Sequence, residues 1–280
     1  MSIFDERKID CHNHLLDPAH FPYAPQAWYQ PVSNEQSNAH YMNNLFDSYG
    51  VQHALIVGPN SGYDTDNRCL LNFIAQGAGR YKGVAVVDNE ISHAELANLK
   101  RQGVVGTTMQ VALLGVDFFR NTQRLLADLA ELDMFADVQV QDDQLLEMAP
   151  LLEKSGVRVL IDHCARPDPT AGVQQKGFQL LLELAATDRY FVKISGMVKA
   201  SKQGYPYEDA FPFVDALLDA FTGDRCMWGS DWPFLRAPER MDYGPMLTLI
   251  EQLVPDPEVR GKLLWDTPYR LFGFGTAASG

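Results

Sequence analysis

The sequence predicts an α/β protein built as one (β/α)8 TIM barrel. Short apolar runs typical of strands alternate with amphipathic helical stretches along the whole chain, and eight such units follow one another. The strand runs are almost continuously apolar, as expected for parallel strands that are buried on both faces. Three of them end in histidine or aspartate, at the end of the strand where a parallel barrel places its active site.

The predicted strands cover residues 8–15, 53–58, 82–87, 104–111, 134–140, 158–164, 190–197 and 226–231. The predicted helices lie near 37–49, 66–78, 92–102, 118–132, 141–155, 176–188, 209–221, 241–253 and 258–271. Gly50, Gly103 and Gly156 precede strands, where the end of a helix favours a left-handed residue. Asp66 and Ser92 are candidate helix N-caps. A doubly wound sheet is the rival fold, but it would carry a glycine-rich phosphate loop after its first strand, where this chain has His-Asn-His.

We expect residues 1–280 to form a single domain, with a frayed tail over 276–280. The formal net charge of −13 argues against a nucleic-acid partner, because binding phosphates requires clustered lysine and arginine. The same charge means that a local arginine or lysine must hold any anionic substrate.

Cysteine usage and the first residues favour a cytoplasmic protein. The four cysteines lack CxxC spacing, which favours reduced, packed thiols. Residues 1–8 are charged and do not resemble a signal peptide, and no apolar run is long enough to span a bilayer. We therefore expect no membrane partner. The oligomeric state stays open, and a homo-oligomer is possible.

His12 and His14 end the first predicted strand. Residues two apart on a strand share a face, so both imidazoles should point to one place, whereas Cys11 should face the helices. His163 and Asp231 end two later strands. The alternative is that the His-x-His pair consists of solvated polar residues at a strand end. Histidines and an aspartate at the carboxyl ends of three different strands favour an active site at the mouth of the barrel.

Several motifs resemble the amidohydrolase superfamily. They are Asp10-Cys-His-Asn-His14, Phe21-Pro-Tyr-Ala-Pro25, Gly62-Tyr-Asp-Thr-Asp-Asn67, Asp162-His-Cys-Ala-Arg-Pro-Asp168, Lys193-Ile-Ser-Gly196 and Trp228-Gly-Ser-Asp-Trp-Pro233. The branch that they resemble contains 2-pyrone-4,6-dicarboxylate lactonase and sugar-acid lactonases. The resemblance implies a (β/α)8 barrel in which an activated water attacks a carbonyl.

Asp231 is the candidate general base. A carboxylate flanked by Trp228 and Trp232 is partly desolvated, which raises its basicity, although it could instead cap the following loop. The candidate groups that polarise the carbonyl and stabilise its oxyanion are the imidazoles of His12, His14 and His163. The alternative is a set of hydrogen-bonded histidines that brace the strand ends.

Two departures from the wider superfamily predict that no metal or other cofactor is bound. Two-metal members carry a bridging lysine or glutamate on strand 4, and residues 106–111 contain neither. Most one-metal members carry a histidine on strand 5, and residues 136–141 contain none. The alternative is one divalent metal ion, zinc, bound by His12, His14 and Asp231.

The predicted substrate-binding residues surround this mouth. Arg166 and Lys199 are candidates to hold a carboxylate, but Arg166 could instead pair with Asp162 or Asp168. The candidates that contact other parts of the substrate are Gln110, Gln139, Tyr23 and Tyr207, for which packing inside the barrel or on its rim is the alternative.

The loop 16–31 should form a wall or lid of the pocket, or simply pack on the rim. The two arginines that the pyrone-dicarboxylate lactonase is expected to use near strand 4 match Thr108 and Leu114 here. Neither is cationic, so we expect a less charged lactone.

These observations predict a hydrolase that opens the lactone of a sugar acid or of a carboxylated ring-cleavage product. Its partner would be a small-molecule substrate. The alternatives are a zinc-dependent amidohydrolase or decarboxylase on the same barrel, a lactone isomerase, and a protein that binds a lactone without turning it over.

Overall fold

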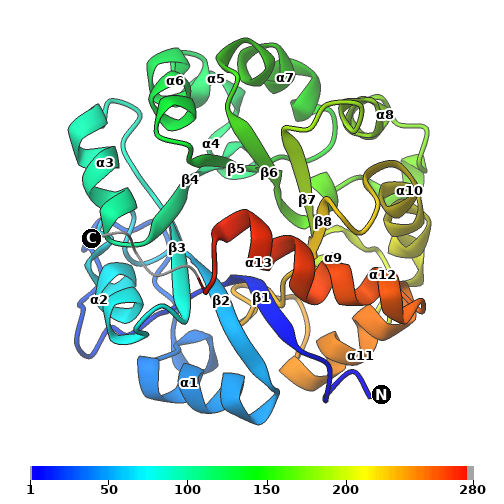
Figure 1. The fold of residues 1–280 in the computed structure, drawn as a ribbon, viewed down its shortest axis with the longest axis horizontal. Helices are drawn as coiled ribbons and strands as arrows, with labels where there is room; N and C mark the ends of the chain where they lie inside the picture. Colours follow the sequence, from blue (N-terminus) through cyan, green and yellow to red (C-terminus); the bar gives the residue numbers. More distant parts are fainter. Residues whose placement is uncertain (1, 276–280) are drawn as a thin grey trace.

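A closed ring of parallel strands lies at the centre of the computed structural model, which describes residues 2–275 (Figure 1). The strands pair in chain order, each with the next. They are β1 (Lys8–Asn13), β2 (Val51–Val57), β3 (Tyr81–Ala85), β4 (Val104–Gln110), β5 (Phe135–Gln139), β6 (Arg158–Ile161), β7 (Tyr190–Ile194) and β8 (Cys226–Trp228). The predicted barrel is confirmed. The predicted tail 276–280 lies outside the described residues.

Helices surround the strands (Figure 1). They are α1 (Ala39–Ser48), α2 (Arg68–Gln76), α3 (His93–Arg101), α4 (Val111–Leu114), α5 (Val116–Phe119), α6 (Gln123–Glu131), α7 (Gln144–Ser155), α8 (Lys176–Leu184), α9 (Met197–Ala200), α10 (Phe211–Phe221), α11 (Tyr243–Leu253), α12 (Pro257–Gly261) and α13 (Thr267–Phe272). The shorter 3-10 and π turns are η1 (Ser33–Glu35), η2 (Asp162–Ala165), η3 (Pro169–Ala171), η4 (Glu208–Ala210) and η5 (Lys262–Asp266). No helix within residues 2–275 combines the length and apolar composition that crossing a bilayer requires.

The predicted helix ends are mostly right. Ser92 caps α3 through a reciprocal capping box with Glu95, and the three glycines before strands have φ between +68° and +94°. Asp66 is the exception. Asn67 immediately precedes α2, and Asp66 instead accepts hydrogen bonds from the backbone and guanidinium of Arg68.

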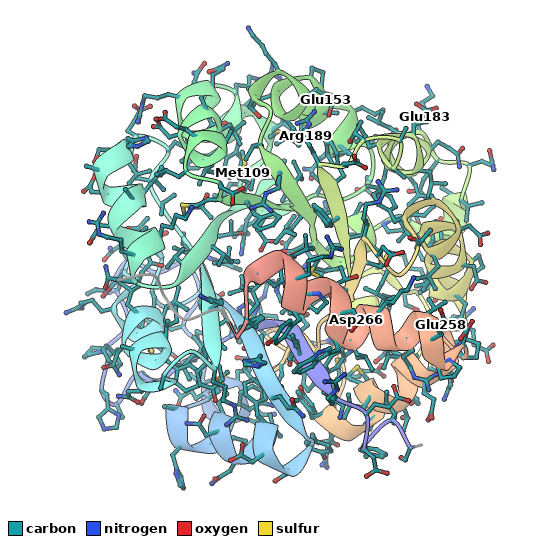
Figure 2. The ribbon with its side chains drawn as sticks, viewed as in Figure 1. Met109, Glu153, Glu183, Arg189, Glu258 and Asp266 are labelled. Atoms are coloured by element: carbon teal, nitrogen blue, oxygen red, sulfur yellow. The ribbon has the colours of Figure 1, made fainter. Side chains whose placement is uncertain are left out.

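Two apolar cores hold the barrel together. The larger one lies between the strands and the surrounding helices. The smaller one combines strand residues such as Leu55 and Leu160 with Phe272 and Phe274 from the C-terminal segment, and α13 crosses this end of the barrel in Figure 1. Charged side chains gather outside, where Arg189 pairs with Glu153 at 2.9 Å (Figure 2).

The orientation predicted for Cys11 is wrong. Cys11 belongs to the smaller core with Ile9 and Leu55, and therefore faces the inside of the barrel. The reason is an irregular register between Asp10 and Asn13, which interrupts the alternation of β1. The four cysteines are free and buried, as predicted.

The seam between β1 and β8 is closed by hydrogen bonds around the predicted site. The Asp231 amide donates to the His12 carbonyl and the His14 amide to the Trp232 carbonyl, both at 2.8 Å. Buried Asp10 accepts from the Ser230 hydroxyl at 2.6 Å and from the Tyr243 phenol at 2.9 Å. These bonds fix the chain on both sides of Asp231 relative to the two histidines of β1.

Candidate functional site

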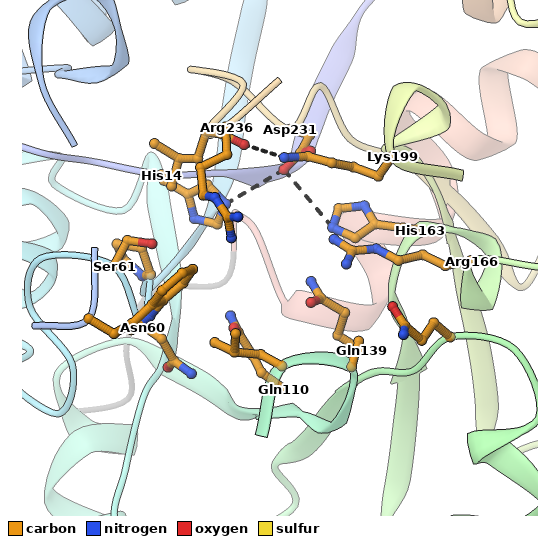
Figure 3. Close-up of a pocket in the computed structure, with 16 residues that line it drawn as sticks. His14, Asn60, Ser61, Gln110, Gln139, His163, Arg166, Lys199, Asp231 and Arg236 are labelled. Carbon is orange, nitrogen blue, oxygen red and sulfur yellow. Dashed lines mark hydrogen bonds and ion pairs between the residues drawn. The ribbon is translucent and has the colours of Figure 1, made fainter. Parts of the chain in front are cut away.

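A cavity of about 360 Å³ opens at the carboxyl ends of the strands (Figure 3). Its lining contains most of the predicted site residues, namely His14, Gln110, Gln139, His163, Arg166, Lys199 and Asp231. Trp28 also lines it, so the first loop contributes to the wall as predicted. The C-terminal segment closes the other end of the barrel, which leaves this mouth as the place where a ligand can meet the strand ends.

Asp231 faces three imidazoles. Its Oδ1 lies 3.7 Å from His12 Nε2, 3.6 Å from His14 Nε2 and 4.0 Å from His163 Nε2. Asp231 has a left-handed φ of +62°, which turns its side chain back over the barrel mouth. The sequence therefore predicted correctly which four residues meet.

The partner of each Nδ1 atom indicates which ring nitrogen of the imidazole carries the proton. His14 Nδ1 lies 2.9 Å from the Val57 carbonyl, which can only accept, so Nδ1 carries the proton. His12 Nδ1 lies 3.1 Å from Asp162, which is likewise an acceptor when ionised. In their neutral forms both rings therefore turn an unprotonated Nε2 toward Asp231. His163 Nδ1 lies 2.9 Å from the Ser195 hydroxyl, which can donate or accept.

Electrostatics keep the carboxylate charged and two of the rings neutral. Burial would raise the pKa of Asp231, but His163, His14, Lys199 and His12 outweigh it and hold that pKa below its ordinary value. Burial lowers the pKa of His12 and, more strongly, that of His163. At neutral pH the site therefore holds one anionic carboxylate beside at least two uncharged imidazoles.

A buried charge cluster lies behind His12. Lys193 Nζ is 2.7 Å from Asp137 and 2.9 Å from Asp162. Burial opposes ionisation of Asp162, but His12 and Lys193 hold its pKa well below the ordinary value, whereas burial and the charge of Asp162 raise the pKa of Asp137 to about 8. The cluster keeps Asp162 ionised. The shorter contact of His12 Nδ1 with Asp162, at 3.1 Å against 3.4 Å to Lys193 Nζ, favours a proton on that nitrogen.

Comparison with known proteins shows the family of this chain. The sequence model of the family described as Amidohydrolase matches residues 9–274. The chain belongs to the amidohydrolase family. It is 32% identical over 274 residues to the 4-sulfomuconolactone hydrolase of Rhizobium radiobacter, covering 94% of this chain and 89% of that one. It is 28% identical over 277 residues to the 2-pyrone-4,6-dicarbaxylate hydrolase of Comamonas testosteroni, with the same coverage.

A solved structure is similar over nearly the whole length. It is that of a probable 2-pyrone-4,6-dicarboxylic acid hydrolase from Acinetobacter baumannii with citric acid bound. The TM-score is 0.83 and the identity 26%, and the match covers 95% of this chain and 99% of the other.

The donor set of this amidohydrolase fits a divalent metal ion. His12 and His14 present Nε2 lone pairs beside a carboxylate oxygen, while their Nδ1 atoms donate to an aspartate and a carbonyl, as metal-bound histidines usually do. His12, His163 and Asp231 also lie close enough together to share one ion. The expected absence of a metal stays a prediction.

Arg166 does not form either ion pair that the sequence left open. Asp162 contacts His12 and Lys193, and Asp168 accepts from Thr170. Arg166 Nε is buried without a hydrogen-bond partner among the described residues. Its guanidinium lines the cavity instead, so it is available to a ligand.

Two predicted contacts are not brought to the cavity. The Tyr207 side chain is buried away from it, and its hydroxyl donates to Glu239 at 2.8 Å. The Tyr23 ring packs against Gly62 and against Tyr63, with ring centroids 5.3 Å apart. Both tyrosines pack in the loops around the mouth, which is the rim alternative, and neither is among the residues that line the cavity.

Sequence reasoning missed several residues. Lys193 and Asp137 had a readable signal, since each is a charged residue inside a strand expected to be buried on both faces. Asn60, Ser61, Gln141 and Arg236 also line the cavity, but they lie in loops whose course the sequence does not predict. Thr108 and Leu114 are not among the lining residues.

Proposed function

We propose that this amidohydrolase opens a small lactone by adding water to its carbonyl carbon. The observation that carries the proposal is the placement of one buried carboxylate, Asp231, within 4.0 Å of three imidazole nitrogens at the barrel mouth. The names of the relatives support the substrate class, because both curated relatives are called hydrolases of cyclic esters or related rings.

In this mechanism Asp231 takes a proton from water as the water oxygen attacks the carbonyl. The ring C–O bond then breaks, and the ring oxygen receives the proton. His163 can donate from Nε2 while neutral if Ser195 donates to its Nδ1, so it can stabilise the oxyanion. His12 and His14 would need a second proton to do the same. Arg166 and Lys199 hold an acid group of the substrate, with Gln110 and Gln139 on its neutral part.

A metal-assisted form of the reaction is the second candidate, and the Nε2 lone pairs of His12 and His14 favour it. His12, His14 and Asp231 would hold the ion, with His163 beside them. A bound divalent cation would supply Lewis acidity to the carbonyl. Elemental analysis of protein purified without added metal separates the two forms. Stoichiometric zinc with activity lost to a chelator would establish the metal, whereas full activity without metal would support the metal-free site.

The reaction itself is tested with a panel of lactones and a pH indicator that reports acid release. We expect Asp231→Asn to lower kcat by about 10²- to 10⁴-fold, the usual contribution of a general base. Asp168→Asn is the matched control, because the Asp168 carboxylate accepts from Thr170 in its own loop and does not line the cavity. Retained turnover in Asp231→Asn would rule out Asp231 as the general base.

The same assay separates the remaining alternatives. A lactone isomerase would convert a lactone without releasing acid, and a decarboxylase would release carbon dioxide. A binding protein would bind a lactone and leave it intact. We expect the enzyme to act in the cytoplasm without nucleic acid or membrane. Light scattering would show whether it forms a homo-oligomer.

A further inference from the structure

Three cations line one side of the cavity without an acidic partner. Arg166 follows β6, Lys199 lies in α9 after β7, and Arg236 follows β8 (Figure 3). None of the three makes an ion pair with a carboxylate of residues 2–275, and Lys199 donates to the Leu235 carbonyl. Asp231 is the one acidic side chain among the residues that line this cavity. The side formed by β6–β8 therefore carries an excess of positive charge, in a chain with a net charge of −13.

The three charges are close enough to affect one another. Burial lowers the pKa of Lys199, and both Arg166 and Arg236 lower it further, while Asp231 opposes them. Arg166 is itself well buried, and its Nε has no partner among the described residues. The three lining cations outnumber the one acidic side chain that lines the cavity, so an anion that entered here would relieve the repulsion between them.

The opposite side of the cavity is polar but uncharged. Asn60 and Ser61 follow β2, Gln110 and Gln139 end β4 and β5, and Gln141 follows β5 (Figure 3). Amides and hydroxyls bind neutral hydroxyl or carbonyl groups as well as they bind water. A ligand that matches both sides has its acidic group at one end only.

Arg236 is held in place by the first loop. Its guanidinium carbon lies 4.9 Å from the ring centre of Trp28 and 5.7 Å from that of Tyr29. Its backbone amide donates to Glu35 at 2.6 Å, and the Tyr29 phenol donates to the other oxygen of Glu35. Stacking on aromatic faces orients a guanidinium while leaving its N–H groups free.

We propose that Arg236 is a specificity-determining residue, which selects lactones with one oxyanionic group and binds that group together with Arg166 and Lys199. The proposal rests on the lactone hydrolase function proposed above. Carboxylate and sulfonate share the required chemistry, because both present oxygens that accept hydrogen bonds from a guanidinium. The neutral part of the lactone lies toward the amides of β4 and β5.

The test compares three matched lactones: a butenolide with a carboxymethyl arm, its sulfomethyl analogue and its carboxamide. Wild-type enzyme should open at least one of the acids with a kcat/KM about 100-fold above that of the amide. Arg236→Met should lower kcat/KM for the acid by about 10- to 100-fold, mainly through KM, because it removes charge-assisted hydrogen bonds. It should change kcat/KM for the amide by less than about threefold, and Arg236→Lys should fall between the two.

Arg240→Met is the matched control. Arg240 lies four residues further along the same loop, pairs with Asp242 at 3.0 Å and does not line the cavity. It should leave kcat/KM for all three lactones unchanged. The comparison of carboxylate with sulfonate identifies which oxyanion the site prefers.

Two outcomes would overturn the proposal while leaving the hydrolase intact. One is equal turnover of acid and amide by the wild type, and the other is an equal loss for both in Arg236→Met. If none of the lactones is opened, the hydrolase proposal fails for this class, and calorimetric binding of 5-hydroxypentanoate against 5-hydroxypentanamide tests the anion site directly. Binding of 5-hydroxypentanoate that weakens in Arg236→Met supports the site. Equal binding of the two probes, or 5-hydroxypentanoate binding that Arg236→Met does not weaken, refutes it.

Discussion

Asp231 has a left-handed backbone conformation and a buried side chain. Both are unfavourable for an aspartate unless contacts with neighbouring residues stabilise them. The support comes from the seam bonds between β1 and β8 and from the imidazoles around its Oδ1. At the scale of the residue, the protonation of the rings then decides the chemistry. With a single proton on Nδ1, His12 and His14 accept at Nε2, whereas His163 can either donate or accept.

The pH dependence of activity follows from these shifts. An aspartate with an ordinary pKa of about 3.9 would begin to protonate below pH 5, and an ordinary histidine would become charged near pH 6.5. The pKa of Asp231 is lowered, so it stays ionised as the pH falls. Those of His12 and His163 are lowered too, so both rings stay neutral. We therefore expect Asp231, His12 and His163 to cause no loss of kcat/KM between pH 7 and about pH 5.

Steady-state kinetics in buffers of constant ionic strength would check this. A fall in kcat/KM with an apparent pKa near 6.5 that persists in the His14→Asn variant would contradict it, since it would mean that His12 or His163 becomes charged within this range. Circular dichroism at each pH would confirm that the protein remains folded.

At the scale of the elements, three neighbouring strands jointly position one histidine. β5 supplies Asp137 and β7 supplies Lys193, while Asp162 follows β6 directly. All three side chains are almost completely buried. Parallel strands in register bring their ends to the same level, so residues far apart in sequence form one charge cluster. Such a cluster is balanced only while its cation is present.

Lys193→Met should therefore destabilise the protein by about 3–5 kcal/mol, because it leaves the buried Asp162 carboxylate without its cation. Urea denaturation would measure this. Lys154→Met, at the exposed end of α7, is the control and should change the free energy of unfolding by less than about 0.5 kcal/mol. Wild-type stability of Lys193→Met would mean that the two carboxylates are held neutral without the lysine.

At the scale of the whole molecule, the barrel separates stability from chemistry by placing them at opposite ends. The carboxyl ends of the strands carry the charged and polar groups of the cavity. The other end is filled by apolar side chains, including Phe272 and Phe274 from the C-terminal segment. A change at one end should therefore leave the other largely intact.

Phe274→Ala tests this separation. It removes a fully buried ring, which typically costs about 3–5 kcal/mol of folding free energy, while kcat of the folded enzyme should change by less than about twofold. Phe4→Ala, at a partly exposed ring, should cost much less. Thermal unfolding and kinetics on the same preparations would measure both effects. A large loss of kcat with retained stability would show that the two ends communicate.

The barrel and the four residues of the central site follow from local features of the amino-acid sequence. Buried parallel strands must be apolar throughout, and their carboxyl ends must meet at one mouth, so His12, His14, His163 and Asp231 had to converge. The sequence also predicted that Arg166 and Lys199 lie at this mouth, and both line the cavity.

Other features of the site depend on how the chain packs. An irregular register in β1 turned Cys11 into the barrel, and loop packing took Tyr23 and Tyr207 away from the cavity and brought Arg236 to it. The pairing of Lys193 with Asp137 and Asp162 joins residues that are 56 and 31 positions apart in the sequence. Strand periodicity is a local property that the sequence carries directly. The path of a loop and the partner of a buried charge depend on long-range contacts, which exist only once the chain has folded.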